Sequence, residues 1–288
     1  MLAGHSMESA VAPRAGCGCT QGFVREITSE LASGSVSFPT SMDATLRIRR
    51  LTEDPACGME DLAKAVSVEP LLAAKLVRLA NSAALRVAGS PVADVRTAVL
   101  RVGFARTRTL SIAVAIDQLV QSRHMRPVLG LARALWMHSV DVASLACVLA
   151  KRFTRLNPDE ALYAGVVHDI GQFYLLSRAV EHPELLEAGA ELSALMFDWH
   201  RAVGHALLES LATPEPVLAA VDGLELYEDA FPPRTTGDVL WIADQLARAP
   251  NPFAAPGGSL PGGQAAAIEG ALADAAGEVA ELAGALQA

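Results

Sequence analysis

The sequence has few of the residues that build disulfide-rich or β-rich proteins. Its 288 residues include four cysteines, and aromatic residues make up 5% of the chain. Four cysteines do not make a disulfide framework in a chain of this length, and Cys17 and Cys19 lack partner ligands at zinc-binding spacing. Alternating polar and apolar runs, the mark of half-buried strands, are also scarce. These absences favour an all-α protein.

Membrane and secretion signals are missing as well. No charged-then-apolar leader opens the chain, and no apolar run of 18 residues is free of charge. We therefore expect no membrane partner and a reducing, cytoplasmic location. No segment resembles a nucleic-acid-binding module, so no nucleic-acid partner is expected.

The net charge of −9 is unevenly divided, with +6 over residues 43–133 and −14 over residues 134–288. We interpret this asymmetry as two halves that attract each other across an interface. The alternative is a basic half that meets an anionic partner.

What the sequence does contain is helical periodicity over most of its length, with 51% hydrophobic residues to form a core. We predict an all-α, multi-helical fold with a smaller N-terminal helical lobe. The predicted segments are a flexible N-terminal tail (1–35, with a short helix at 22–31), an N-terminal lobe (36–126), a larger helical lobe (127–249), a Pro/Gly linker (250–264) and a C-terminal amphipathic helix (265–288).

The C-terminal segment carries an apolar stripe at nearly heptad spacing. The stripe consists of Ile268, Leu272, Ala275, Val279, Leu282 and Leu286. Such a helix either docks on the body of its own chain or pairs with a second chain in a homodimer, and the sequence leaves both open.

Polar residues occupy core-facing positions on three predicted helices. His138 falls in the apolar stripe of a long helix that ends near residue 153. His168 and Asp169 lie in an apolar helical run, and Asp244 shares a face with apolar residues. Buried imidazoles and carboxylates are costly unless something pairs with them, and a first-row divalent metal would satisfy all four. Taken singly, each also fits a hydrogen-bonded core residue.

The order His, His-Asp, Asp resembles the HD superfamily of metal-dependent phosphohydrolases, and the wider sequence resembles the HDOD (HD-related output domain) family within it. The resemblance rests on residues 69–76, 79–83, 98–103, 136–139, 167–171 and 199–204, and it covers roughly residues 38–249. It implies an HD-like helical bundle that carries His138, His168, Asp169 and Asp244 as metal ligands.

The same resemblance bears on catalysis. Many HDOD domains have lost metal ligands and act as regulatory or interaction modules. His200 matches a histidine that holds a further metal in the related HD-GYP phosphodiesterases, so it is a candidate ligand. The paired histidines expected after the following proline turn are replaced by Leu224 and Glu225, and Gln172, Phe173 and Tyr174 stand where HD-GYP enzymes have Gly-Tyr-Pro.

Three functions therefore remain open. The favoured hypothesis is a bacterial signal-transduction module that binds a protein partner or small ligand and does not catalyse a reaction. The alternative is a phosphohydrolase acting on a nucleotide or other phosphoester, in which Fe, Mn, Zn or Mg activates a water and Asp169 is the candidate catalytic residue. The third is a structural role for the His-Asp pair alone.

Overall fold

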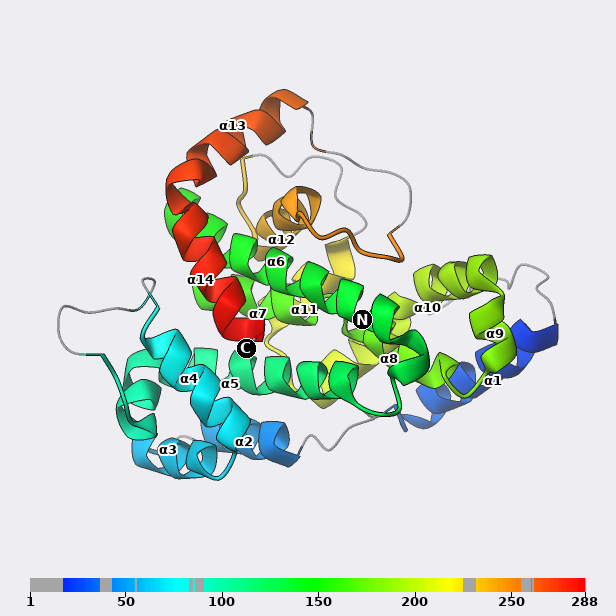
Figure 1. Ribbon diagram of the computed structural model, residues 1–288, viewed down its shortest axis with the longest axis horizontal. Helices are drawn as coiled ribbons and strands as arrows, with labels where there is room; N and C mark the ends of the chain where they lie inside the picture. The colour runs from blue at the N-terminus through cyan, green and yellow to red at the C-terminus, as the bar shows by residue number, and fades with distance from the viewer. Residues whose placement is uncertain are drawn as a thin grey trace, which may run out of the picture.

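The computed structural model contains helices and turns, with no strand in the part of the chain that it describes (Figure 1). The structure describes residues 18–36, 43–54, 56–82, 85, 91–224, 232–254, 260 and 262–287. The first 17 residues of the predicted tail, residues 255–259 and 261 of the predicted linker and Glu225 lie outside the described residues. The all-α prediction is confirmed.

The helices are α1 (Gly18–Ser33), α2 (Asp43–Glu53), α3 (Met59–Ser67), α4 (Pro70–Ala80), α5 (Val95–Gln121), the 3₁₀ turn η1 (Arg126–Val128), α6 (Leu129–Phe153), α7 (Pro158–Val167), α8 (Ile170–Ala179), α9 (Pro183–Glu187), α10 (Gly189–Ser210), α11 (Glu215–Gly223), α12 (Thr236–Leu246), α13 (Gly262–Leu272), η3 (Ala273–Ala275) and α14 (Ala276–Gln287).

The N-terminal lobe consists of α2, α3 and α4 packed on α5. Helix α5 is interrupted at Gly103, whose φ of 83° and ψ of 174° lie outside helical geometry, so it consists of two helical stretches joined at a kink. The kink lets one helix serve both lobes, because α5 also contacts α6 and α7.

The second lobe is built around α6, which contacts α7, α8, α12 and α14. The core-facing position predicted for His138 is confirmed, since His138 is buried together with Leu135, Val142 and Leu149 on the same face of α6. The segment Arg126–Phe153 is long and apolar enough to cross a membrane, but 72% of its apolar window is buried inside the protein. Burial on that scale fits a core helix of a folded body.

Arginines of the N-terminal lobe join the two lobes. Arg106 on α5 pairs with Asp159 on α7 at 2.6 Å. Arg108 donates to the carbonyl oxygen of Leu211 at 2.9 Å, and Arg49 on α2 donates to that of Ser210 at 2.6 Å. The last two contacts place cations at the C-terminal end of α10, where the helix dipole favours positive charge. The ion pair of Arg106 with Asp159 agrees with the predicted attraction between a basic and an acidic half.

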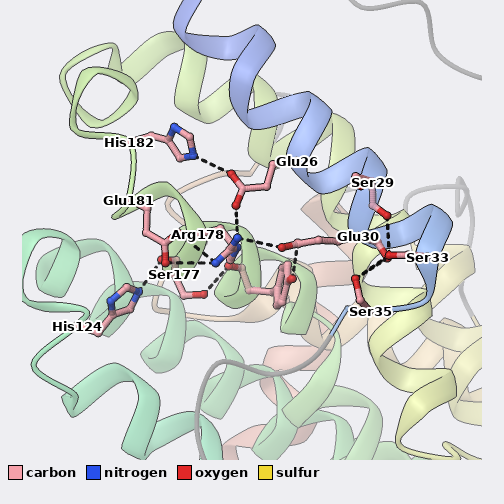
Figure 2. A network of polar contacts seen from close by, with 11 residues as sticks. Glu26, Ser29, Glu30, Ser33, Ser35, His124, Ser177, Arg178, Glu181 and His182 are labelled. Carbon is pink, nitrogen blue, oxygen red and sulfur yellow. Dashed lines mark hydrogen bonds and ion pairs between the residues drawn. The ribbon is translucent and has the colours of Figure 1, made fainter.

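Helix α1 is part of the packed body, which differs from the flexible tail expected for residues 1–35. Phe23 and Ile27 are buried. A polar network ties α1 to α8 and the start of α9 (Figure 2): Arg178 pairs with Glu26 and Glu30, and Tyr174 donates to Glu30 at 2.6 Å. Apolar burial supplemented by this network explains why α1 extends beyond the short helix predicted at 22–31.

The C-terminal helix docks on its own chain. Helix α14 lies against α6, α4 and α5 (Figure 1), with Leu282, Ala285 and Leu286 buried. At one end Glu278 pairs with Lys151 and Arg152 of α6. At the other the buried Lys75 donates to the carbonyl oxygen of Leu286 at 2.6 Å. Intramolecular docking was one of the two predicted outcomes; the homodimer stays a prediction.

The ion pairs of Glu278 should make the docking of α14 sensitive to pH. Burial raises the pKa of the Glu278 carboxyl, but hydrogen bonds from Lys151 and Arg152 outweigh it, so the net pKa lies below the ordinary 4.5. A carboxyl whose pKa is depressed on folding stabilises the fold above its unfolded pKa, and that stabilisation is lost as pH falls through the folded value. Wild type should therefore exceed Glu278→Gln in stability at pH 6.5, and the difference should shrink below pH 4.

Urea midpoints of wild type and Glu278→Gln, measured from pH 6.5 to pH 3.5, test this expectation. Glu269→Gln, on the exposed side of α13, is the matched control and should differ little from wild type throughout. A difference in urea midpoint between wild type and Glu278→Gln that stays constant over this pH range would contradict the expectation.

Candidate metal centre

The first histidine of the centre is held by α6. His138 is 2% exposed. Its Nδ1–H donates to the carbonyl oxygen of Ala249 at 2.8 Å, so the ring is fixed and its Nε2 points the other way. Hydrogen bonding of one ring nitrogen to a carbonyl is the usual way in which a protein orients an imidazole for a metal.

His168 and Asp169 lie at a break between two helices. The sequence indicated one continuous helical run, but α7 ends at Val167 and α8 begins at Ile170. Asp169 has φ of −98° and ψ of 15°, outside helical geometry, and it occupies the N-cap position of α8. An aspartate there ordinarily accepts from the first backbone N–H groups of the helix. The Asp169 side chain makes no such bond and faces the two histidines.

Close backbone packing brings these elements together. A Cβ added at Gly165 on α7 would lie 2.3 Å from the Cα of Ala143 on α6. One added at Gly171 on α8 would lie 2.0 Å from the carbonyl oxygen of His200 on α10. Only glycine fits at either position, so α7 and α8 can approach their neighbours closely enough for the polar side chains to meet.

Four of the predicted ligands converge. The Nε2 atoms of His138 and His168 are 3.3 Å apart. Asp244 on α12 brings Oδ1 to 3.1 Å from Nε2 of His138, and Asp169 brings Oδ2 to 3.1 Å from Nε2 of His168 and 3.7 Å from that of His138. Ligand atoms of His138, His168 and Asp244 all lie within 4.8 Å of one another, a group that could hold a metal ion.

The protonation pattern of this cluster calls for a cation. His168 also donates its Nδ1–H to a carbonyl oxygen, that of Gly165 at 2.8 Å. In the neutral tautomer each ring therefore turns a bare Nε2 lone pair toward the other and toward two carboxylates. Burial lowers the pKa of His168, but the charge and hydrogen bond of Asp169 outweigh it, with Asp244 adding to the effect, and the pKa rises to about 9. Negative charge at this point is stabilised either by a proton or by a metal ion.

A cavity of about 510 Å³ opens beside the cluster. Its wall includes His200 and Arg201 of α10 and Trp241 of α12, with Phe197 at 41% exposure. His200 thus shares the cavity, but it is outside the group of converging ligand atoms found among the described residues. Its Nδ1–H is directed at backbone oxygens of Met196 and Phe197. Leu224, the residue expected to lack ligand capacity, also lines the cavity.

The sequence did not indicate Asn251 and Gln172 as part of the site. Asn251 was assigned to the linker at 250–264, yet it lines the cavity and donates to both Asp169 and Gln172. Phe253 in the same segment is buried. The start of the predicted linker is therefore packed on the site, because α12 ends at Leu246 and the chain turns back. The prolines on either side of Asn251 are typical of a linker, so the sequence did not indicate this role.

Comparison with known proteins assigns the family. The model of the HDOD domain matches residues 38–223. The chain belongs to the HDOD family. A protein of Treponema pallidum (strain Nichols) with no characterised function is 26% identical over 213 residues, which are 68% of this chain and 39% of that protein. The HDOD chain thus spans well under half of this curated relative.

Solved structures share the fold. A protein of Shewanella amazonensis SB2B, with the proposed function of metal-dependent phosphohydrolase, has a TM-score of 0.74 at 22% identity over 93% of this chain and 99% of its own. An HDOD domain protein of unknown function from Geobacter sulfurreducens has a TM-score of 0.59 at 24% identity, with 92% and 96% covered. A proposed signal transduction protein of Marinobacter aquaeolei VT8 has a TM-score of 0.60 at 19% identity, with 93% and 66% covered.

A divalent metal should stabilise the HDOD fold through this cluster. At a free metal concentration of about 100 times the dissociation constant, binding adds about 2.7 kcal/mol to the free energy of unfolding. We expect Mn²⁺ or Zn²⁺ to raise the melting temperature of wild type, and the increase to be lost in His138→Ala and in His168→Ala.

His124→Ala is the matched control for these substitutions. His124 is an exposed histidine whose Nε2 meets the carbonyl oxygen of Ser177, away from the cavity, and this variant should keep the full metal-dependent increase. If the metal still raises the melting temperature of both His138→Ala and His168→Ala, the metal binds elsewhere.

Proposed function

We propose that this chain is a bacterial HDOD signalling module that binds a protein partner or a small ligand and retains one metal centre of the HD type. His138, His168, Asp169 and Asp244 would hold the metal. The donor set of two imidazoles and two carboxylates suits Fe, Mn or Zn, and Mg less well because Mg prefers oxygen ligands. The Marinobacter aquaeolei protein of similar fold, named for signal transduction, agrees with this role.

The observation that carries the proposal is the contrast between the two parts of the cavity. At the cluster, Nε2 of His138 lies 3.3 Å from Nε2 of His168 and 3.1 Å from Oδ1 of Asp244. Oδ2 of Asp169 lies 3.1 Å from Nε2 of His168. The cavity lining also includes Leu224, at a position where the resemblance expects the first of two paired histidines, beside His200. Leucine has no donor atom, so the second cation of a two-metal clamp would lack a ligand at this position.

Asp169 is also poorly placed to act as a base. Its Oδ2 accepts from Asn251 at 3.0 Å and lies 3.1 Å from Nε2 of His168. Oδ2 therefore has little capacity left for a proton from water, and only Oδ1 of this carboxylate could accept one. This engagement favours binding over catalysis.

The second candidate is a metal-dependent phosphohydrolase acting on a nucleotide or phosphoester. It is favoured by the group of His138, His168 and Asp244, which could hold a metal, and by Arg201 on the cavity wall, since arginine suits phosphate oxygens. A bound divalent cation would acidify a coordinated water and polarise a phosphoryl oxygen. The chain's own contribution would be to orient that ester in the cavity, with Asp169 as the proton acceptor.

We further propose a cytoplasmic location. Among the described residues Cys57 and Cys147 are free thiols, and burial raises the pKa of the Cys147 thiol to about 12, which keeps it protonated and unreactive. Free cysteines suit a reducing compartment.

Turnover by metal-loaded protein separates the two candidates. Wild type and the double variant His168→Ala/Asp169→Ala are compared on p-nitrophenyl phosphate, bis-p-nitrophenyl phosphate and cyclic and linear nucleotides, with His124→Ala as control. For a signalling module we expect equal background rates in all three proteins. A wild-type rate more than about tenfold above the double variant, or about 1.4 kcal/mol of transition-state stabilisation, would instead establish the phosphohydrolase.

A further inference from the structure

The segment that follows α12 folds back across the metal centre. Helix α12 ends at Leu246, two residues after its ligand Asp244. Ala249 then makes two backbone bonds: its N–H donates to Oδ2 of Asp141 at 3.0 Å, and its carbonyl oxygen accepts from Nδ1 of His138 at 2.8 Å. The segment from Ala249 to Phe253, called the strap below, is thus anchored on α6 at two positions.

Asn251 is the residue of the strap that reaches a second ligand. Its Nδ2 donates to Oδ2 of Asp169 and to Oε1 of Gln172, both at 3.0 Å. Its Oδ1 accepts the backbone N–H of Phe253 at 2.8 Å, which assigns the orientation of the amide. Both N–H groups and the oxygen of the side chain are therefore used, and the amide is fixed in one orientation.

The position of Asp169 explains why such a donor matters. As the N-cap residue of α8, Asp169 accepts the backbone N–H groups of Gln172 and Phe173 through its own carbonyl oxygen, whereas its side chain, which could cap the first turn, makes no capping bond. Capping would draw the carboxylate away from the histidines. The bond from Asn251 supplies a competing donor on the cavity side, at the oxygen that lies 3.1 Å from Nε2 of His168.

We propose that Asn251 is a positioning residue of the metal centre, which holds the Asp169 carboxylate in its ligating orientation. The inference rests on the proposed binding of a metal by His138, His168, Asp169 and Asp244. It assigns a role to a residue beyond the part of the chain that matches the HDOD domain, residues 38–223. Hydrogen-bond partners of ligands commonly change metal affinity in this way.

The test compares Asn251→Ala, which removes the side chain, with Asn251→Leu, which keeps its approximate volume but has no donor. The affinity for Zn²⁺ is measured by competition with a chromophoric chelator, and the geometry is followed by the visible spectrum of the Co²⁺-loaded protein. We expect both variants to bind Zn²⁺ about 10- to 100-fold more weakly than wild type and to show an altered Co²⁺ spectrum. Asn157→Ser, which keeps a good N-cap residue on α7 far from the cavity, should behave as wild type.

The outcomes separate the two proposals. If wild type binds neither ion, the metal centre itself is wrong. If wild type binds and both variants bind equally tightly with an unchanged spectrum, the centre stands and the role of Asn251 is wrong. If Asn251→Leu restores wild-type affinity while Asn251→Ala does not, packing of the strap and not the amide supports the site, which also overturns the role. The melting temperature of each metal-free variant confirms that it is folded.

Discussion

The candidate metal centre depends on two imidazoles, those of His138 and His168, whose Nε2 atoms face each other. Because the Nδ1–H of His138 and that of His168 are both used on backbone carbonyl oxygens, their Nε2 atoms meet at 3.3 Å. Asp169 and Asp244 add negative charge at the same point. With both rings neutral such a buried cluster is costly, since burial penalises charge and the lone pairs repel. A proton on His168, whose pKa is raised to about 9, relieves this at one nitrogen, whereas one metal ion can accept both imidazoles and neighbouring carboxylates at once, which is why the arrangement points to a metal more strongly than any of its residues does singly.

Other features of the fold make that meeting possible. Glycine at residue 165 lets α7 lie against α6, and glycine at residue 171 lets α8 lie against α10. The break between α7 and α8 directs the side chains of His168 and Asp169 into one cavity. As a result, the Asp169 side chain makes no capping hydrogen bond to the first turn of α8. Local rules of helix capping are commonly broken at functional sites, where the lost bond is compensated elsewhere. In this chain the compensation for Asp169 comes from His168 and Asn251.

Helical periodicity was sufficient to predict the all-α fold and the core-facing positions of His138 and Asp244. On a regular helix, the position of a residue in the sequence determines which side of the helix its side chain points to. The periodicity also indicated that Asp169 faces the core, where the residue is 4% exposed, but it missed the break between α7 and α8, because apolar residues continue on both sides of a break that depends on tertiary contacts. It also missed Asn251, whose neighbouring prolines are typical of a linker. The sequence could not distinguish docking of α14 from pairing, because the same apolar stripe suits either surface. The contacts of Lys75 and Glu278 show α14 docked on its own chain, and pairing with a second chain stays a prediction.

X-ray absorption by Zn²⁺-loaded protein tests the central claim most directly, because it reports the atoms around the ion. The account predicts two imidazole nitrogens at about 2.0–2.1 Å and carboxylate oxygens at about 2.0–2.2 Å. One imidazole should be lost from the spectrum in His138→Ala, and also in His168→Ala. A wild-type spectrum without imidazole scattering, or one that neither substitution changes, would contradict the assignment of this cluster as the metal centre.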